Sequence, residues 1–71
     1  MPRYYFKLVD GYIVSDYGVH ELEDAKAARS AAIDLARSVR EVRPDLIGQH
    51  CSISVTDEDG AGVCAIPLEI L

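Results

Sequence analysis

The chain has 71 residues, of which 49% are hydrophobic, and its formal net charge is −5 at pH 7. This length is enough for one domain, which we expect to span residues 1–71, and the apolar fraction is typical of a folded domain rather than a disordered one. No apolar run approaches the ~18 residues of a membrane span, so we expect no membrane insertion. The negative charge argues against nucleic acid as the main partner, because phosphate binding requires basic surfaces.

The first residues do not have the composition of a secretory signal. Lys7 and Asp10 interrupt the apolar stretch that such a signal requires. We therefore expect a cytoplasmic protein.

Residues 3–9 alternate in character, as the two faces of a β-strand do. Tyr4, Phe6 and Leu8 share the face that we expect to lie in the core, whereas Arg3, Tyr5, Lys7 and Val9 share the other. Asp10-Gly11 predicts a tight hairpin turn, because glycine tolerates a positive φ. A return strand begins at residues 12–14, and Ser15, Asp16 and Gly18 favour a short strand at the sheet edge.

The segment that follows has the pattern of an amphipathic helix. Asp24 is the predicted N-cap, and Pro44 ends the helix because the residue before a proline is disfavoured in the α region. The apolar stripe at helical spacing comprises Ala25, Ala28, Ala32, Leu35, Ala36, Val39 and Val42. Because four of these seven are alanines, the helix axis can lie close to a sheet.

The last third of the chain predicts a second hairpin. Cys51, Ile53 and Val55 alternate with Ser52, Ser54 and Thr56, which indicates a half-buried strand. Residues 57–60 form the predicted turn, and residues 63–68 form the last strand, for which Pro67 favours an edge position.

The order ββαββ predicts an α+β fold. If all neighbouring strands are antiparallel, the strand after the helix must lie beside the first strand. The expected sheet is therefore four-stranded and antiparallel in the order 2-1-3-4, with the one helix packed on one face.

The best candidate interaction surface lies on the opposite, open face of this sheet. It comprises Arg3, Tyr5, Lys7, Ser52, Ser54 and Thr56. Tyrosine and arginine are enriched at the energetic centres of protein interfaces. The alternative is an ordinary solvated sheet face.

Other kinds of site have weak sequence support. The predicted hairpin register places Val55 opposite Cys64 and separates the two cysteines by ~13 Å, too far for a disulfide. The acidic residues 57–59 do not match a calcium-loop pattern and are typical of a polar turn. His20 is a candidate general base in the loop before the helix. We predict no metal, no cofactor and no catalytic residues.

The ending AIPLEIL is strongly apolar, and Ile70 and Leu71 have no obvious place in a monomer core. Exposed apolar groups on an edge strand favour pairing with another chain. We therefore expect self-association, with a homodimer as its simplest form.

Three segments together resemble a known family. They are the opening MPRYYFKLVDG, the segment Gly18-Val19-His20-Glu21-Leu22 before Asp24 and the alanine-rich helix, and the ending from Val55 through Asp59-Gly60 to Pro67-Leu68. The patterns M-P-R-Y-[FY]-F and D-x-[DE]-G-…-P-[FL] are similar to those of a family of small, uncharacterised bacterial proteins described as a domain of unknown function. The resemblance implies a bacterial cytoplasmic protein and brings no activity, cofactor or site residue.

The sequence therefore favours a small non-enzymatic interaction or regulatory module that self-associates and binds a protein partner. The alternative is nucleic-acid binding, either through the Arg3, Tyr5 and Lys7 strip or through the helix. Residues 26–43 contain five basic and two acidic side chains. A third hypothesis is a small enzyme with His20 as its base.

Overall fold

The computed structural model describes residues 1–46 and 50–68. Within these residues the elements are β1 (Arg3–Asp10), β2 (Ile13–Glu21), α1 (Ala25–Val42), the short 3₁₀ helix η1 (Pro44–Leu46), β3 (Cys51–Thr56) and β4 (Gly62–Pro67). The four strands form one antiparallel sheet in the order β2-β1-β3-β4. The predicted α+β fold, its ββαββ order and its strand order are confirmed.

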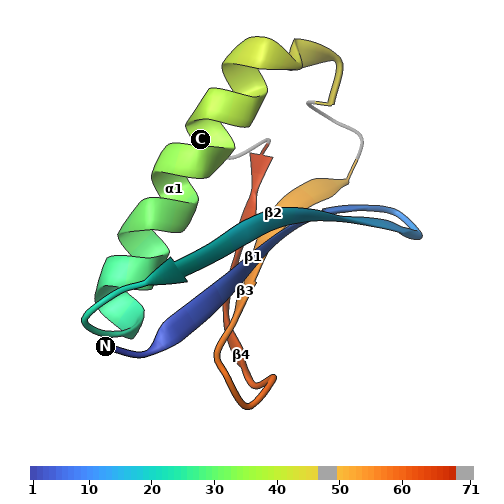
Figure 1. Ribbon diagram of the computed structural model, residues 1–71. Coiled ribbons are helices and arrows are strands. Elements are labelled where there is room, and N and C mark those ends of the chain that lie inside the picture. Colours follow the sequence, from blue (N-terminus) through green and yellow to red (C-terminus); the bar gives the residue numbers. More distant parts are fainter. Residues whose placement is uncertain (47–49, 69–71) are drawn as a thin grey trace.

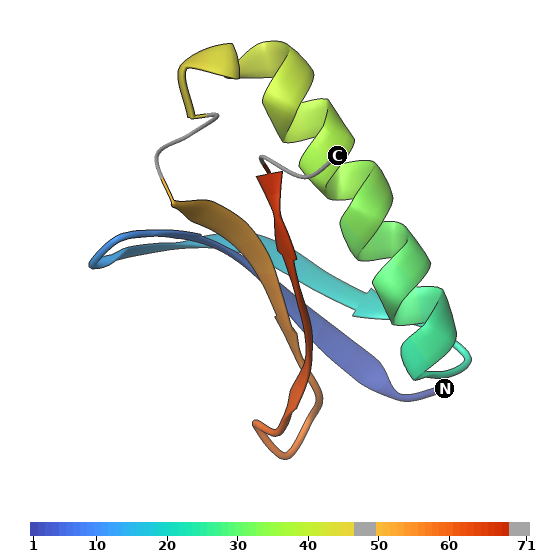
Figure 2. The ribbon, with the colours of Figure 1, turned by 180° about the vertical axis from the view of Figure 1, so that it is seen from behind.

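The hydrophobic core lies between α1 and one face of the sheet (Figures 1 and 2). Its buried members are Tyr4, Phe6, Leu8, Ala28, Ala32, Ala36, Val39, Cys51, Ile53, Val55, Ile66 and Leu68. The alternation along β1 therefore sends the predicted residues inward. Ile66 and Leu68 are buried as expected, whereas Ile70 and Leu71 lie outside the described residues.

Helix α1 begins and ends where its sequence signals predict. The Asp24 side chain accepts a hydrogen bond from the Ala27 backbone N–H at 2.9 Å, which satisfies one of the free donors of the first turn. The Arg43 N–H donates to the Val39 carbonyl at 2.7 Å, and Pro44 then starts η1. Three buried alanines allow close contact, and α1 packs chiefly against β3 and β4.

The predicted apolar stripe of α1 is wrong at its two ends. Ala25 and Val42 are exposed, although both continue the helical spacing of the buried residues. Figures 1 and 2 show α1 along one face of the sheet, with its C-terminal end reaching past the end of β4.

Strand β2 is longer than expected. It covers nine residues, although Ser15, Asp16 and Gly18 predicted a short strand. The register with β1 shifts once, because Lys7 lies opposite Asp16 while Phe6 lies opposite Gly18. Gly18 adopts a φ of 114°, and its N–H binds the Asp16 carboxylate at 2.9 Å. The polar and flexible residues therefore form a β-bulge inside the strand instead of ending it.

The β3–β4 hairpin follows its predicted pattern. Val55 lies opposite Cys64 and Ile53 lies opposite Ile66. Strand β4 begins at Gly62 and ends at Pro67, one residue earlier at both ends than expected. The alternation of β3 is complete, because Cys51, Ile53 and Val55 are buried whereas Ser52, Ser54 and Thr56 are half-buried.

Candidate functional site

The open-face residues predicted from the sequence do lie together on two adjacent strands. Tyr5 lies opposite Thr56 and Lys7 lies opposite Ser54, while Ser52 lies opposite Val9. Arg3 and Lys7 are exposed, whereas Tyr5 and the β3 side chains are half-buried. The surface is therefore a partly exposed face of the sheet.

The positive charge of this face is balanced by β2. The Arg3 Nε lies 3.5 Å from the Glu21 Oε1, and both side chains are more than half exposed. Lys7 lies opposite Asp16 in the register. Because each cation faces an acid on the neighbouring strand, the face does not offer the basic track that binding of phosphate groups requires.

The structure gives His20 a different setting from the predicted loop. It lies in β2, opposite Tyr4, and its ring packs against the Phe6 ring with centroids 5.2 Å apart in an edge-to-face arrangement. The Asp16 carboxylate accepts a hydrogen bond from the Gly18 N–H. His20 therefore extends the apolar face of β1 toward the sheet edge.

The two cysteines are held in environments that favour the neutral thiol. Cys51 is buried at the start of β3 and Cys64 is half-buried on β4. Burial raises the pKa of the Cys51 thiol, and the neighbouring Asp10 carboxylate raises it further. Burial also raises the pKa of the Cys64 thiol. A raised pKa lowers the thiolate fraction, and with it the nucleophilicity, of both side chains at neutral pH.

The acidic residues of the β3–β4 turn have structural partners. The Asp57 carboxylate accepts hydrogen bonds from the Asp59 and Ala61 N–H groups, both at 2.9 Å. The Glu58 carboxylate accepts from the Arg3 N–H at 2.8 Å and so joins this turn to the start of β1. Carboxylates at these positions stabilise the turn.

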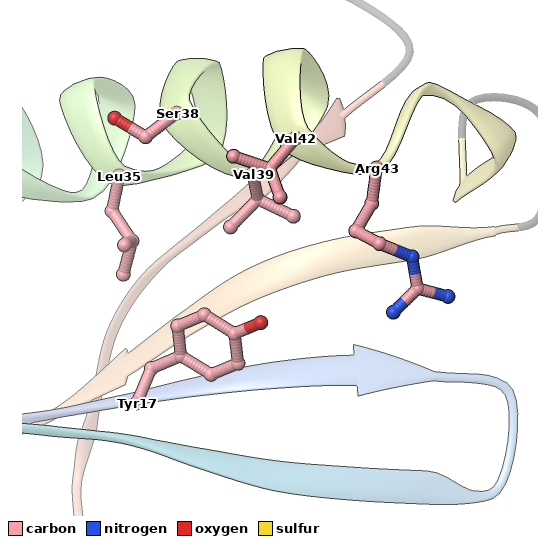
Figure 3. A pocket seen from close by; sticks show the side chains of 6 residues that line it. All are labelled: Tyr17, Leu35, Ser38, Val39, Val42 and Arg43. Carbon is pink, nitrogen blue, oxygen red and sulfur yellow. The ribbon is translucent and has the colours of Figure 1, made fainter.

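A groove that the sequence analysis did not predict lies between the C-terminal half of α1 and β2 (Figure 3). Its volume is about 200 Å³. It is lined by Tyr17, Leu35, Ser38, Val39, Val42 and Arg43. Figure 3 shows the Tyr17 ring on the sheet side of the groove and the helix residues on the other.

The bulge of β2 brings Tyr17 into this groove. Tyr17 is the extra residue between Asp16 and Gly18, which face consecutive residues of β1. Bulges commonly change the direction of one side chain in this way. At the far end, the Arg43 guanidinium binds the Asp45 carboxylate through two contacts of 3.2 Å. This pair raises the pKa of Arg43 and lowers that of Asp45.

Exposed apolar side chains are concentrated along β2 and at the C-terminal end of α1. Seven large hydrophobic residues are exposed in the described part of the chain, and five of them lie between residues 12 and 19. We use the name β2 surface for Tyr12, Ile13, Val14, Tyr17, Val19 and Val42. The sequence did carry a signal for it, since residues 12–19 combine five large apolar side chains with no lysine, arginine or proline.

The flank of α1 that faces away from β2 is basic. Lys26, Arg29 and Arg37 are exposed and Arg40 is half-buried, at a spacing that places them along one side of the helix. The ion pairs found among residues 1–46 and 50–68 involve Arg3 and Arg43 instead. The two flanks of α1 therefore differ, with apolar groove residues on one and cations on the other.

Within the described ranges, no helix is long and apolar enough to cross a membrane. The comparisons with curated proteins and with solved structures gave no match. The model of one family, the Domain of unknown function (DUF6894), matches residues 3–69, which is nearly the whole chain. The expected membership in a family described as a domain of unknown function is thereby confirmed, and the chain belongs to the DUF6894 family.

Proposed function

We propose that the chain is a small, non-enzymatic protein-interaction module of the bacterial cytoplasm that binds its partner through the β2 surface. The observation that carries this proposal is the concentration of exposed apolar side chains on one strand. Ile13 is 66% exposed and Val14 is 57% exposed, although both have the residue type of a strand core. An edge strand that exposes apolar side chains on both faces of its sheet is suited to pairing with a partner.

The dimensions of the groove favour a protein partner over a small molecule. Its volume of about 200 Å³ is below the range of ~300 Å³ and more that is usual for ligand pockets. A groove of this size takes one or two side chains of a partner. Tyr17, which is 39% exposed, offers both a ring and a hydroxyl, as tyrosines at interface hot spots do.

The environment of His20 and of the thiols supports a non-enzymatic role. The His20 ring is packed on Phe6, and the Asp16 carboxylate accepts a hydrogen bond from the Gly18 N–H of the bulge. The pKa of both thiols is raised, which is the opposite of what an activated nucleophile requires.

In-cell photocrosslinking would test the proposal. A benzophenone amino acid replaces Tyr12 on the β2 surface, and in a matched control it replaces Ser30 on the outer side of α1, where Ser30 is also exposed. We expect discrete crosslinked protein bands from position 12, absent from position 30 and lost when Val14→Asp is added. Equal crosslinking from both positions, or none from position 12, would contradict the proposal.

Nucleic-acid binding is the second candidate, and the basic flank of α1 is the observation that favours it. Fluorescence anisotropy with a labelled single strand at low salt would detect such binding. If it occurs, it should weaken steeply between 50 and 200 mM salt, as expected for about four phosphate contacts. At a fixed salt concentration, the variant Arg37→Glu should then bind the labelled strand more weakly than the unmodified chain. Binding of this kind, together with no crosslinks from position 12, would favour this candidate over a protein partner.

A further inference from the structure

We infer that the partner held by the β2 surface is a second copy of this chain, joined through an antiparallel pair of β2 edges. This inference rests on the proposed function, because it names the partner of the same surface. The two-fold axis of the pair lies at Ser15. Val14 of each copy then faces Asp16 of the other, and the two four-stranded sheets continue into one.

The two edges of the sheet are not equally open to pairing. Strand β4 has six residues and ends in Pro67, which cannot donate a backbone hydrogen bond. Strand β2 has nine residues and contains no proline, lysine or arginine. Because edge strands that must stay unpaired usually carry such residues, β2 is the edge suited to another chain.

The backbone of β2 presents a defined set of groups to the outside. The β1–β2 turn has a two-residue loop, so Asp10 and Ile13 are a hydrogen-bonded pair. The same alternation is visible at the other end of β1, where the Leu22 N–H donates to the Pro2 carbonyl at 3.0 Å. It follows that Ile13 and Ser15 direct their backbone groups toward β1, whereas Val14 and Asp16 direct theirs outward.

The bulge restricts regular pairing to the first half of β2. Tyr17 and Gly18 occupy the space of one residue in the ladder. Beyond Asp16, the backbone N–H and C=O groups therefore no longer alternate regularly between the β1 side and the outer side of the strand. An antiparallel partner can therefore form regular backbone hydrogen-bonded pairs only along residues 13–16, although its side chains can still lie beside Tyr17. This half also carries Ile13 and Val14, both of which are more than half exposed.

Charge and hydrogen bonding select one register within this half. An axis at Asp16 would place two carboxylates directly opposite each other, which is destabilising. An axis at Val14 would leave Asp16 opposite the Tyr12 of the turn and form a single hydrogen-bonded pair. An axis at Ser15 forms two Val14–Asp16 pairs, and each pair exchanges two backbone hydrogen bonds.

The same register fills the groove. Ile13 lies opposite Asp10 and therefore points to the α1 side of the sheet, where Tyr17 also lies. With the axis at Ser15, Ile13 of one copy stands opposite Tyr17 of the other. Its side chain then enters the mouth of the groove beside Val42, which is 77% exposed in the single chain.

Charge balance allows two acidic copies to meet at this edge. The net charge of each chain is −5, but the only charged residue between positions 12 and 18 is Asp16, which faces Lys7 of its own chain. The acidic turn at residues 57–59 belongs to the β3–β4 hairpin at the other side of the sheet. The repulsion between copies is therefore smallest along the first half of β2.

The available area fits a weak dimer. From their exposed fractions, Tyr12, Ile13, Val14, Tyr17 and Val42 offer on the order of 500 Å² per copy, if a full tyrosine carries about 200 Å². A dimer would thus bury about 1,000 Å² in total, the lower limit of specific interfaces. We expect association that depends on protein concentration in the micromolar range.

Site-specific disulfide crosslinking tests this register. Ser15 is exposed, and residues opposite each other in a non-hydrogen-bonded pair have Cβ atoms about 5 Å apart. Ser15→Cys should form a covalent dimer under mild oxidation on the order of tenfold faster than Ser30→Cys on α1. The unmodified chain controls for Cys51 and Cys64, and circular dichroism checks that each variant is folded.

Two further variants examine the register itself. Val14→Cys alone and Asp16→Cys alone should crosslink slowly, because identical residues off the axis lie on a diagonal of about 7–8 Å. A mixture of the two variants should crosslink rapidly, since it places the two thiols opposite each other. Sedimentation of the unmodified chain and of Val14→Asp gives a second readout, in which only the former should show a dimer.

The inference would be overturned if Ser15→Cys crosslinked no faster than Ser30→Cys, or if Val14→Asp sedimented as the same dimer as the unmodified chain. The proposed function can fail separately. Photocrosslinks from position 12 to a different protein, without the Ser15 disulfide, would retain an interaction module and exclude a second copy as its partner.

Discussion

Strands β2 and β3 flank β1 on its two sides and pair with it in the same antiparallel manner, yet their burial is opposite. Every second residue of β3 is buried, and Ile53 is completely inaccessible. No residue of β2 is buried, although β2 is the longer strand. The difference arises because α1 packs chiefly on β3 and β4.

The two strands are therefore stabilised by different interactions within the same sheet. Strand β3 is held by backbone hydrogen bonds and by a dry core, whereas β2 is held by hydrogen bonds to β1 and by few apolar contacts. A backbone ladder exposed to water has a small net stability, so β2 is the part that can change partners at the least cost. The surface proposed for interaction therefore lies on the strand that contributes least to the core.

Hydrogen exchange should show the largest separation between the two strands. At low protein concentration, the Ile53 amide should exchange only through global unfolding, while the outward Val14 and Asp16 amides should exchange with little protection. The difference should approach the whole unfolding free energy, about 5 kcal/mol for a small domain. Equal protection of Val14 and Ile53 in dilute solution would mean that the β2 edge is covered within a single chain.

Matched truncations should give the next largest effect. Ile53→Ala should lower the unfolding free energy by about 2–5 kcal/mol, because it leaves a cavity in a fully buried site. Ile13→Ala should change it by less than about 0.5 kcal/mol, since this side chain is mostly exposed. Urea denaturation measures both values. Similar losses for the two variants would remove the distinction between the strands.

Removal of the helix cap should produce an intermediate effect on the covered side. Asp24→Ala removes the 2.9 Å hydrogen bond to the Ala27 N–H and should cost about 1 kcal/mol. The loss should appear as faster exchange in α1 and β3, with the β2 amides unchanged. Asp24→Asn is the control, because asparagine is an equally good N-cap and should retain most of the stability. If Asp24→Asn lost as much stability as Asp24→Ala, the missing N-cap hydrogen bond would not be the cause of the loss.

The smallest effect should appear at alkaline pH and should arise from Cys51 at the start of β3. Its pKa in the folded chain is raised above the usual 9.0, so folding favours the neutral thiol. The stability that this contributes is complete below pH 9 and is lost as the pH rises through the folded pKa. The unfolding free energy of the unmodified chain relative to Cys51→Ala should therefore decrease above pH 9. If the unfolding free energies of the two proteins changed with pH in the same way, the Cys51 thiol would make no such contribution.

Most of the fold could be predicted because its signals are local. The alternation of Tyr4, Phe6 and Leu8 gives the buried face of β1, and Asp24 and Pro44 give the limits of α1. The register of the β3–β4 hairpin follows from its turn, which is why Val55 was correctly placed opposite Cys64. Each of these features depends on residues close together in the sequence.

The errors concern residues whose environment depends on distant elements. The bulge at Asp16 and Gly18 allowed β2 to continue where the sequence predicted its end. Val42 has the spacing of a buried helix residue but lines the open groove opposite Tyr17, so it is exposed. His20 was placed in a loop and instead packs on Phe6. In each case the local pattern was correct, but the element that covers or extends it lies elsewhere in the chain.

The candidate site could likewise be predicted only in part from the sequence. The open face with Arg3, Tyr5 and Lys7 follows from strand alternation, and the structure does bring it together with the polar side of β3. Its charge balance could not be foreseen, because Glu21 and Asp16 lie on a strand whose length was underestimated. The groove at Tyr17 requires both the bulge in β2 and the position of α1 over the sheet. Both depend on contacts between segments that are distant in the sequence, so the groove could not be predicted.

Sequence signals are enough to predict the order of the elements, their antiparallel arrangement and the inward face of β1, β3 and β4, because periodicity, caps and turns act over a few residues. Which strand stays uncovered depends instead on packing between distant elements. One helix with a narrow alanine face covers about half of a four-stranded sheet, and its packing on β3 and β4 leaves β2 open. The exposed edge and the groove are therefore products of packing, whereas the apolar residues that occupy them were already visible in the sequence.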